Sequence, residues 1–240
     1  MASLAAARAA NESAFSASSN IPVALFVGGT SGIGQAVAET LAKHTKGNIH
    51  IIICGRNRKA AQEIIASFPK SSSGKGKYEF VECDATLMKN VHDSTSFLLS
   101  SLPKLNYIVA TTGYLTLKGW DETSEGNDKK LTLSYYTRWK FICDLMPLLE
   151  KAKEAGEDAK VLTVLGAGKG IKIDLNDLGL KKGYTVANSA PTAVTYNDCM
   201  IEVSPLAHCH ILLLITTCNV TPSHLPRPIP PCRLPIPTPA

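Results

Sequence analysis

The stretch VALFVGGTSGIGQAVAETL, residues 23–41, decides how this chain folds. Its first five residues, 23–27, form a continuous apolar run, which is typical of a strand covered on both faces of a sheet. Four glycines follow, and then Ile33, Val37 and Leu41 recur at helical spacing. A strand that runs through glycines directly into a helix predicts a turn that holds the phosphates of a dinucleotide.

The glycines of this turn have separate roles in that interpretation. We expect Gly28 to permit the tight turn, Gly32 to let the backbone approach a pyrophosphate, and Gly34 to allow close packing of the helix on the strand. The N-terminus of the helix then offers free amides and the positive end of its dipole to the phosphates. The alternative is a turn with a purely structural role. The predicted cofactor contacts in the turn are Gly28, Thr30, Ser31, Gly32, Ile33 and Gly34.

The end of the second apolar run, IHIIIC at residues 49–54, bears on which dinucleotide would bind. A free ribose 2′-hydroxyl is usually met here by an acidic residue. This chain instead presents Arg56 and Asn57, and a guanidinium suits a 2′-phosphate. The sequence therefore favours NADP(H) over NAD(H), with both residues as contacts. The alternative is that the basic residues here are solvated charges at the start of a helix.

Apolar runs and amphipathic stretches continue to alternate as far as residue 203. Strands separated by helices imply right-handed crossovers and an α/β fold with a doubly wound, parallel, Rossmann-like sheet. In the last helix we expect Ser189 to be the N-cap and Pro191 to lie in the first turn. The further strands expected are residues 78–83, 105–110 and 160–165.

The composition changes after Val203, and this divides the chain. Nine of the fourteen prolines follow that residue, and proline lacks the amide donor of a helix or central strand. We expect a helical lead-in at residues 1–21, a single domain at 22–203, and a largely unstructured proline-rich tail at 204–240. Residues 210–220 are an alternative sixth strand. Without them the sheet would be incomplete, and its fifth strand would be an unprotected edge.

Two further interpretations of the tail stay open. In one, the tail is a ligand for a proline-binding domain. In the other, it is a translated intron or the product of a shifted reading frame, because Val-Ser can be encoded by a common splice-donor sequence and the composition changes at that point. In the second case the chain would be a truncated product.

Composition excludes several classes of protein. With 45% hydrophobic residues the chain can bury a core, and its net charge of +5 is scattered, which disfavours a nucleic-acid surface. The apolar run at 211–215 is too short to span a membrane.

Seven cysteines without close pairs indicate a reducing compartment, and we expect the cytoplasm. The N-terminus lacks the apolar segment of a signal peptide, although a transit peptide is an alternative. His208, Cys209 and His210 do not have zinc-site spacing, so no metal is expected.

These motifs resemble the short-chain dehydrogenase/reductase superfamily over about residues 22–203, and within it a divergent fungal group with stretches like YYTRW and GLKKGY. GGTSGIG is similar to its cofactor turn, Asp84 to its acidic residue beside the adenine, and Gly113 to a glycine after its fourth strand. The resemblance implies an NADP(H)-dependent oxidoreductase that moves a hydride between nicotinamide and a small carbonyl or alcohol. A homodimer is an open expectation.

The resemblance also implies four catalytic residues, of which only Tyr196, the proton donor, is present. Met200 stands at the lysine position, Gly166 at the serine position and Ser134 at the asparagine position. An unassisted tyrosine has a pKa of about 10 and is a poor base at neutral pH. The alternative is therefore an NADP(H)-binding protein without catalysis, in which Tyr196 packs in the core. The residues considered as replacements are Lys169, Lys172, Tyr184, Tyr135, Tyr136 and Arg138.

Overall fold

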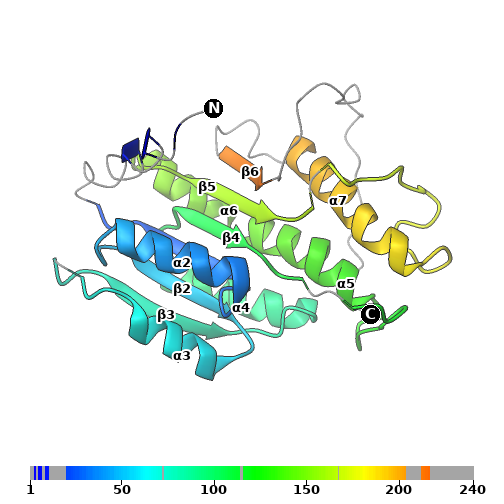
Figure 1. Ribbon diagram of the computed structural model, residues 1–240, viewed down its shortest axis with the longest axis horizontal. Helices are drawn as coiled ribbons and strands as arrows, with labels where there is room; N and C mark the ends of the chain where they lie inside the picture. The colour runs from blue at the N-terminus through cyan, green and yellow to red at the C-terminus, as the bar shows by residue number, and fades with distance from the viewer. Residues whose placement is uncertain are drawn as a thin grey trace.

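A computed structural model of the chain describes residues 20–71, 73–113, 116–166 and 168–203, the strand at 212–216, and a few residues before position 20. Strands and helices alternate along it (Figure 1). The strands are β1 (Val23–Val27), β2 (His50–Gly55), β3 (Lys77–Glu82), β4 (Tyr107–Ala110), β5 (Lys160–Val164) and β6 (Leu212–Thr216). The helices are α2 (Gly32–His44), α3 (Arg58–Ser67), α4 (Met88–Ser101), α5 (Lys129–Leu131), the π-helix η1 (Thr132–Tyr136), α6 (Thr137–Glu154) and α7 (Val186–Val203).

The strands form one sheet in the order β3-β2-β1-β4-β5-β6, and every neighbouring pair is parallel. From β1 the chain first builds outward to β2 and β3, and then returns to add β4 on the other side. The carboxyl ends of β1 and β4 therefore flank the point where the winding reverses, and ligands bind at that point in open α/β sheets. The predicted doubly wound Rossmann-like domain is confirmed.

The strand β6 corrects the expectation that β5 is an unprotected edge. It runs parallel to β5, with Leu212 opposite Lys160, and so the open alternative of a sixth strand within residues 210–220 is the one observed. The rest of the proline-rich tail and His208–His210 lie outside the described residues, as does most of the lead-in at residues 1–19.

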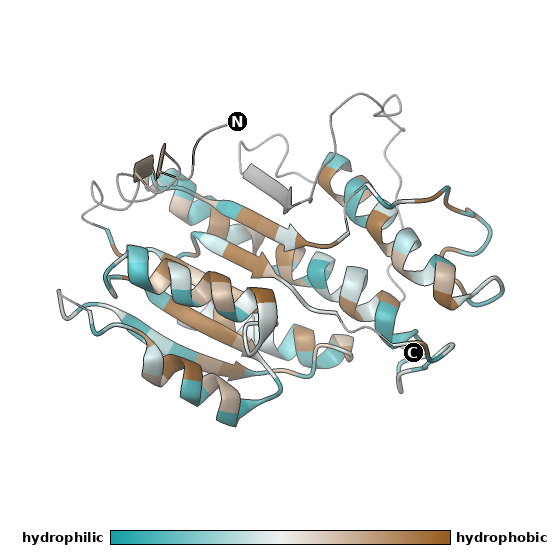
Figure 2. Ribbon diagram, in the orientation of Figure 1, coloured by the Kyte–Doolittle hydropathy of each residue, from teal (hydrophilic) through white to brown (hydrophobic). Residues whose placement is uncertain are grey.

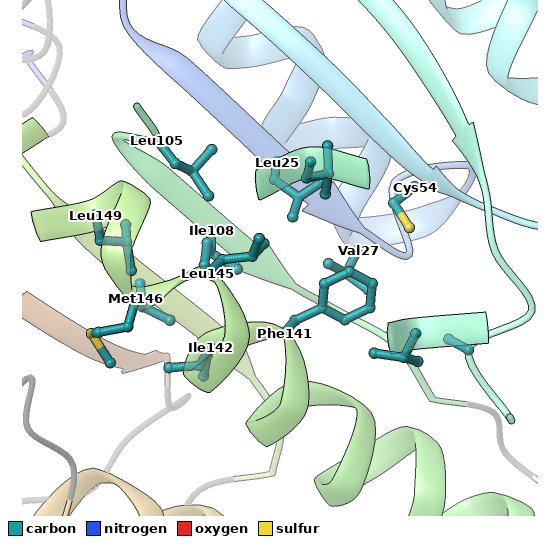
Figure 3. Close-up of a cluster of buried hydrophobic side chains, with 14 of the residues drawn as sticks. Leu25, Val27, Cys54, Leu105, Ile108, Phe141, Ile142, Leu145, Met146 and Leu149 are labelled. Atoms are coloured by element: carbon teal, nitrogen blue, oxygen red, sulfur yellow. The ribbon is translucent and has the colours of Figure 1, made fainter. Parts of the chain in front are cut away.

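Two hydrophobic layers cover the two faces of the sheet. Side chains alternate along β1, so that Phe26 packs with the small residues of α2 on one face, while Leu25 packs with Leu145 of α6 on the other. Figure 3 shows the second layer, where Ile108 of β4 lies between Leu25 and the α6 side chains. Figure 2 shows hydrophobic residues along β2, β4 and β5 in the middle of the sheet, as expected of strands buried on both faces.

Helix α7 begins earlier than predicted, at Val186. The side chain of Asn188 accepts a hydrogen bond from the amide of Thr185 at 2.9 Å, and the hydroxyl of Thr185 accepts one from the amide of Asn188 at 3.0 Å. This reciprocal pair is a capping box, and it satisfies two amides at the helix start. Ser189 is therefore not the N-cap. It is buried inside the helix, and its hydroxyl donates to the carbonyl of Val186 at 3.2 Å.

No helix among the described residues is both long and apolar enough to cross a membrane. No three His, Cys, Asp or Glu side chains in the same part of the chain are grouped so as to hold a metal ion.

Candidate functional site

A cavity of about 350 Å³ opens at the carboxyl ends of the central strands, where the winding of the sheet reverses. Eight of the predicted site residues line it, although they come from four separate segments of the chain. They are Gly28, Thr30, Ser31, Gly32, Ile33, Arg56, Asp84 and Gly113. The predicted residues Gly34, Asn57 and Tyr196 do not line it.

The glycine turn has the geometry that its sequence predicts. Gly28 has φ +92°, and a Cβ there would lie 2.9 Å from the hydroxyl of Thr111. A Cβ on Gly34 would lie 2.5 Å from the same hydroxyl and 2.6 Å from the carbonyl oxygen of Gly28, so only glycine lets α2 pack this closely on the sheet. Gly32 differs from both, because a Cβ there would meet no atom within 4 Å. It faces open space on the cavity side.

The N-terminus of α2 has backbone amides that are available to bind an anion. Ser31 precedes the helix with extended backbone, and its side chain caps none of the helix amides. The first turn contains no acidic residue that would compensate the helix dipole. Uncapped amides at the positive end of a helix of 13 residues favour a phosphate group. The residues present therefore fit the pyrophosphate of a dinucleotide.

The end of β2 presents one free cation to the cavity. Arg56 is exposed and makes no ion pair with another described residue. Arg58 is engaged instead, because its guanidinium lies 3.1 Å from the Glu82 carboxylate and 5.0 Å from the centre of the Phe80 ring. Asn57 caps α3, since its side-chain oxygen accepts a hydrogen bond from the amide of residue 60 at 3.0 Å. The structure thus places Asn57 in a helix cap outside the cavity wall.

The wall beside β3 contains a fixed carboxylate and two thiols. One oxygen of Asp84 accepts hydrogen bonds from the amide and the hydroxyl of Thr86, at 3.1 and 2.8 Å, which orients the carboxylate. Cys54 and Cys83 are buried and both line the cavity. A hydrogen bond with Cys54 lowers the pKa of the Cys83 thiol, while the same contact raises that of Cys54. Sequence reasoning missed both cysteines, although their position at strand ends was a usable signal.

The opposite wall is built by β4, η1 and β5. Thr112 and Gly113 follow β4, Leu133 comes from the π-helix, and Val164 ends β5. The hydroxyl of Thr112 donates to the carbonyl of Leu133 at 2.8 Å and joins β4 to the π-helix. Single π-turns inside helices are frequent at functional sites. Leu133 was not predicted, because no sequence period reveals where a helix takes up an extra residue.

Tyr196 lies elsewhere. Its side chain is buried beside Tyr135, with ring centres 5.1 Å apart, and its hydroxyl donates to the carbonyl oxygen of Leu178 at 2.9 Å. Burial, reinforced by the nearby Tyr136 and Asp177, raises the pKa of Tyr196 to about 12. The tyrosine therefore keeps its proton at neutral pH and points at the segment before α7.

Three further positions correspond to the lysine, serine and asparagine of the resemblance, and the residues there do not replace those catalytic groups. Met200 is buried one turn after Tyr196, and Gly166 is exposed after β5. A Cβ on Gly113 would lie 4.0 Å from the Ser134 hydroxyl, which places Ser134 beside the β4 wall. None of the six replacement candidates lines the cavity: Lys169 and Lys172 are exposed, Tyr136 and Tyr184 are partly buried, and Tyr135 and Arg138 are buried.

Comparison with known proteins agrees with this arrangement. Residues 22–136 match the family model described as short chain dehydrogenase. An oxidoreductase of Emericella nidulans is 33% identical over 211 residues, which are 86% of this chain and 62% of that protein. The chain thus spans less than two thirds of this relative.

Solved structures share the fold. The RhlG protein of Pseudomonas aeruginosa, in an active-site complex with NADP, has a TM-score of 0.59 at 20% identity, covering 85% of this chain and 73% of that one. An NADH-dependent reductase complexed with NAD has a TM-score of 0.59 at 16% identity, covering 82% and 78%.

Proposed function

Because the chain belongs to the short-chain dehydrogenase/reductase superfamily, we propose that it is an oxidoreductase that binds NADP(H) in the cavity and acts on a small carbonyl or alcohol. When bound, the cofactor supplies a hydride to a carbonyl carbon, and the carbonyl oxygen takes up a proton to give the alcohol. The chain's own residues bind and orient the cofactor and supply that proton.

The observation that carries the proposal is the convergence of the glycine turn and Arg56 on one cavity. The uncapped amides of α2 are the expected ligands of the pyrophosphate. Arg56 would hold the 2′-phosphate, since its guanidinium is free of other described charges. Gly55, the last residue of β2, has no side chain, so that position offers no carboxylate for the contact that NAD(H) would use.

A titration of the purified protein with NADPH and with NADH tests this proposal. Quenching of Trp120 and Trp139 and the rise in melting temperature report binding. We expect NADPH to bind at least about tenfold more tightly than NADH, because a charge-assisted hydrogen bond to the 2′-phosphate contributes at this level. Binding of neither cofactor to a monodisperse sample contradicts the proposal, and preference for NADH contradicts the role of Arg56.

The proposed proton donor is Tyr196. Burial raises its pKa to about 12, so the hydroxyl carries a proton to donate at neutral pH but is a weaker acid than an ordinary tyrosine, whereas a general acid works best with a pKa near the working pH. To reach a substrate, the hydroxyl must exchange its hydrogen bond with Leu178 for one with the substrate oxygen.

A second candidate function is NADP(H) binding without catalysis. The position of Tyr196 favours it, because the hydroxyl is bonded to Leu178 and the residue does not line the cavity. Turnover separates the two candidates. A sample that binds NADPH tightly is incubated with a panel of aldehydes and ketones, and NADPH oxidation is followed by absorbance. Consumption that Tyr196→Phe abolishes supports the enzyme, and tight binding without consumption supports the second candidate.

A further inference from the structure

A buried arginine lies directly behind the β4–η1–β5 wall of the cavity. Arg138 is the second residue of α6 and is only 1% exposed. Its guanidinium donates to the carbonyl oxygens of Thr112 at 2.6 Å, Val164 at 2.9 Å and Leu133 at 3.4 Å, and to the hydroxyl of Thr163. The three residues whose carbonyls it holds all line the cavity.

All four partners are neutral, and no carboxylate among the described residues pairs with this guanidinium. Burial lowers the pKa of Arg138 to about 10, which still leaves the side chain charged at neutral pH. A buried cation without a counter-ion is costly, and proteins usually pair such charges. Here the carbonyl oxygens carry only partial negative charges, so they offset only part of the positive charge of the guanidinium. Arg138 therefore makes a positive contribution to the electrostatic potential on this side of the cavity.

The position of Arg138 relative to a bound dinucleotide follows from the proposed function, on which this inference rests. Arg56 marks the β2 side of the cavity as the end that takes the 2′-phosphate. The glycine turn after β1 takes the pyrophosphate, so the nicotinamide half extends toward β4 and β5. The charge of Arg138 thus lies on the nicotinamide side. The oxidised nicotinamide ring carries a positive charge, whereas the reduced ring carries none.

We propose that Arg138 is a specificity-determining residue that makes the cavity select the reduced cofactor over the oxidised one. Repulsion between the guanidinium and a cationic ring weakens binding of the oxidised form, while the uncharged ring escapes this repulsion. The two forms share the adenosine, the 2′-phosphate and the pyrophosphate, so only the ring distinguishes them. A site of this kind is occupied mainly by the reduced cofactor when both forms are present at equal concentration.

The test compares dissociation constants for NADPH and NADP⁺ in the wild type, Arg138→Met and Arg138→Lys. We expect the wild type to bind NADPH about tenfold more tightly than NADP⁺, which corresponds to a repulsion of about 1.4 kcal/mol between the guanidinium and the cationic ring. The ratio of the two dissociation constants should approach unity in Arg138→Met and stay within about twofold of wild type in Arg138→Lys. A substitution that only loosened the cavity would weaken the binding of NADPH and NADP⁺ alike and would leave the ratio of the two dissociation constants unchanged.

The outcomes separate this inference from the proposed function. Equal binding of the two forms by the folded wild type overturns the inference and leaves the proposed function standing. The same holds for a ratio that Arg138→Met does not change. If the methionine variant fails to fold, the wild-type ratio and the lysine variant still decide. Failure of the wild type to bind either form overturns the proposed function, and the inference with it.

Discussion

The hydroxyl of Tyr196 donates a hydrogen bond to the carbonyl oxygen of Leu178 at 2.9 Å, and this bond joins α7 to the segment that precedes it. The same segment is held to α7 a second time, because the hydroxyl of Thr195 bonds to both the amide and the carbonyl of Ile171, at 2.9 and 2.7 Å. Two neighbouring residues of one helix therefore fix residues 171–178. A catalytic role would therefore require the Tyr196 hydroxyl to break its hydrogen bond with the Leu178 carbonyl.

Replacing Tyr196 by Phe tests the structural role of this bond. Removal of the hydroxyl leaves the Leu178 carbonyl without its partner, and we expect the free energy of unfolding to fall by about 1 kcal/mol. Urea denaturation measures it. Tyr136→Phe is the matched control, because the Tyr136 hydroxyl forms no hydrogen bond with any described residue. An equal loss of stability in both variants would show that the Leu178 bond contributes nothing specific.

Replacing Gly34 by Ala tests the packing of α2 on the sheet. The new Cβ would lie 2.5 Å from the Thr111 hydroxyl and 2.6 Å from the Gly28 carbonyl oxygen, so the helix must shift. We expect a loss of about 1–3 kcal/mol in the free energy of unfolding and weaker NADPH binding. Gly119→Ala is the control, because that exposed glycine has no atom within 4 Å of a Cβ and should change stability by about 0.5 kcal/mol or less.

Replacing Arg56 by Ala tests the cofactor preference. Loss of a charge-assisted hydrogen bond to the 2′-phosphate should weaken NADPH binding roughly 10- to 100-fold and leave NADH binding nearly unchanged. Arg58→Ala is the matched control, because that guanidinium is already engaged with Glu82 and the Phe80 ring. Isothermal titration gives both constants. A larger effect from Arg58 than from Arg56 would reassign the 2′-phosphate contact.

The alkaline stability of the chain should depend on Tyr107. Burial, with the nearby carboxylates of Asp158 and Glu157, raises the pKa of Tyr107 to about 12, against about 10 in the unfolded chain. Between these values the unfolded chain has released the proton and the folded chain retains it. The free energy of unfolding therefore falls as pH rises through this window.

Urea denaturation of the wild type and Tyr107→Phe at pH 8 to 11 measures this dependence. The wild type should lose stability relative to the variant above about pH 10, and the difference should be constant below pH 9. All other titrating groups contribute alike to both proteins. A difference that is the same at every pH would show that the folded and unfolded chains ionise Tyr107 equally.

Local signals in the sequence were sufficient for most of the fold. The apolar run before Gly28 and the helical spacing after it identified β1, the turn and α2, because each depends on neighbouring residues. Eight of the predicted site residues meet at one cavity, since the parallel strands bring the residues after them to the same edge of the sheet. The N-cap of α7 was placed four residues late, because Thr185 and Asn188 form a capping box that competes with Ser189.

The sequence by itself therefore determined the doubly wound sheet, the glycine turn and the cation at the end of β2, because these follow from periodicity and from residues adjacent in the chain. Only the tertiary structure decided the rest. In the folded chain, Tyr196 is hydrogen-bonded to Leu178 and does not line the cavity. Arg138 is buried against carbonyl groups from three separate segments. Both arrangements depend on how α6, α7 and η1 pack on the sheet, and no local pattern encodes the partner of a side chain that is distant in sequence.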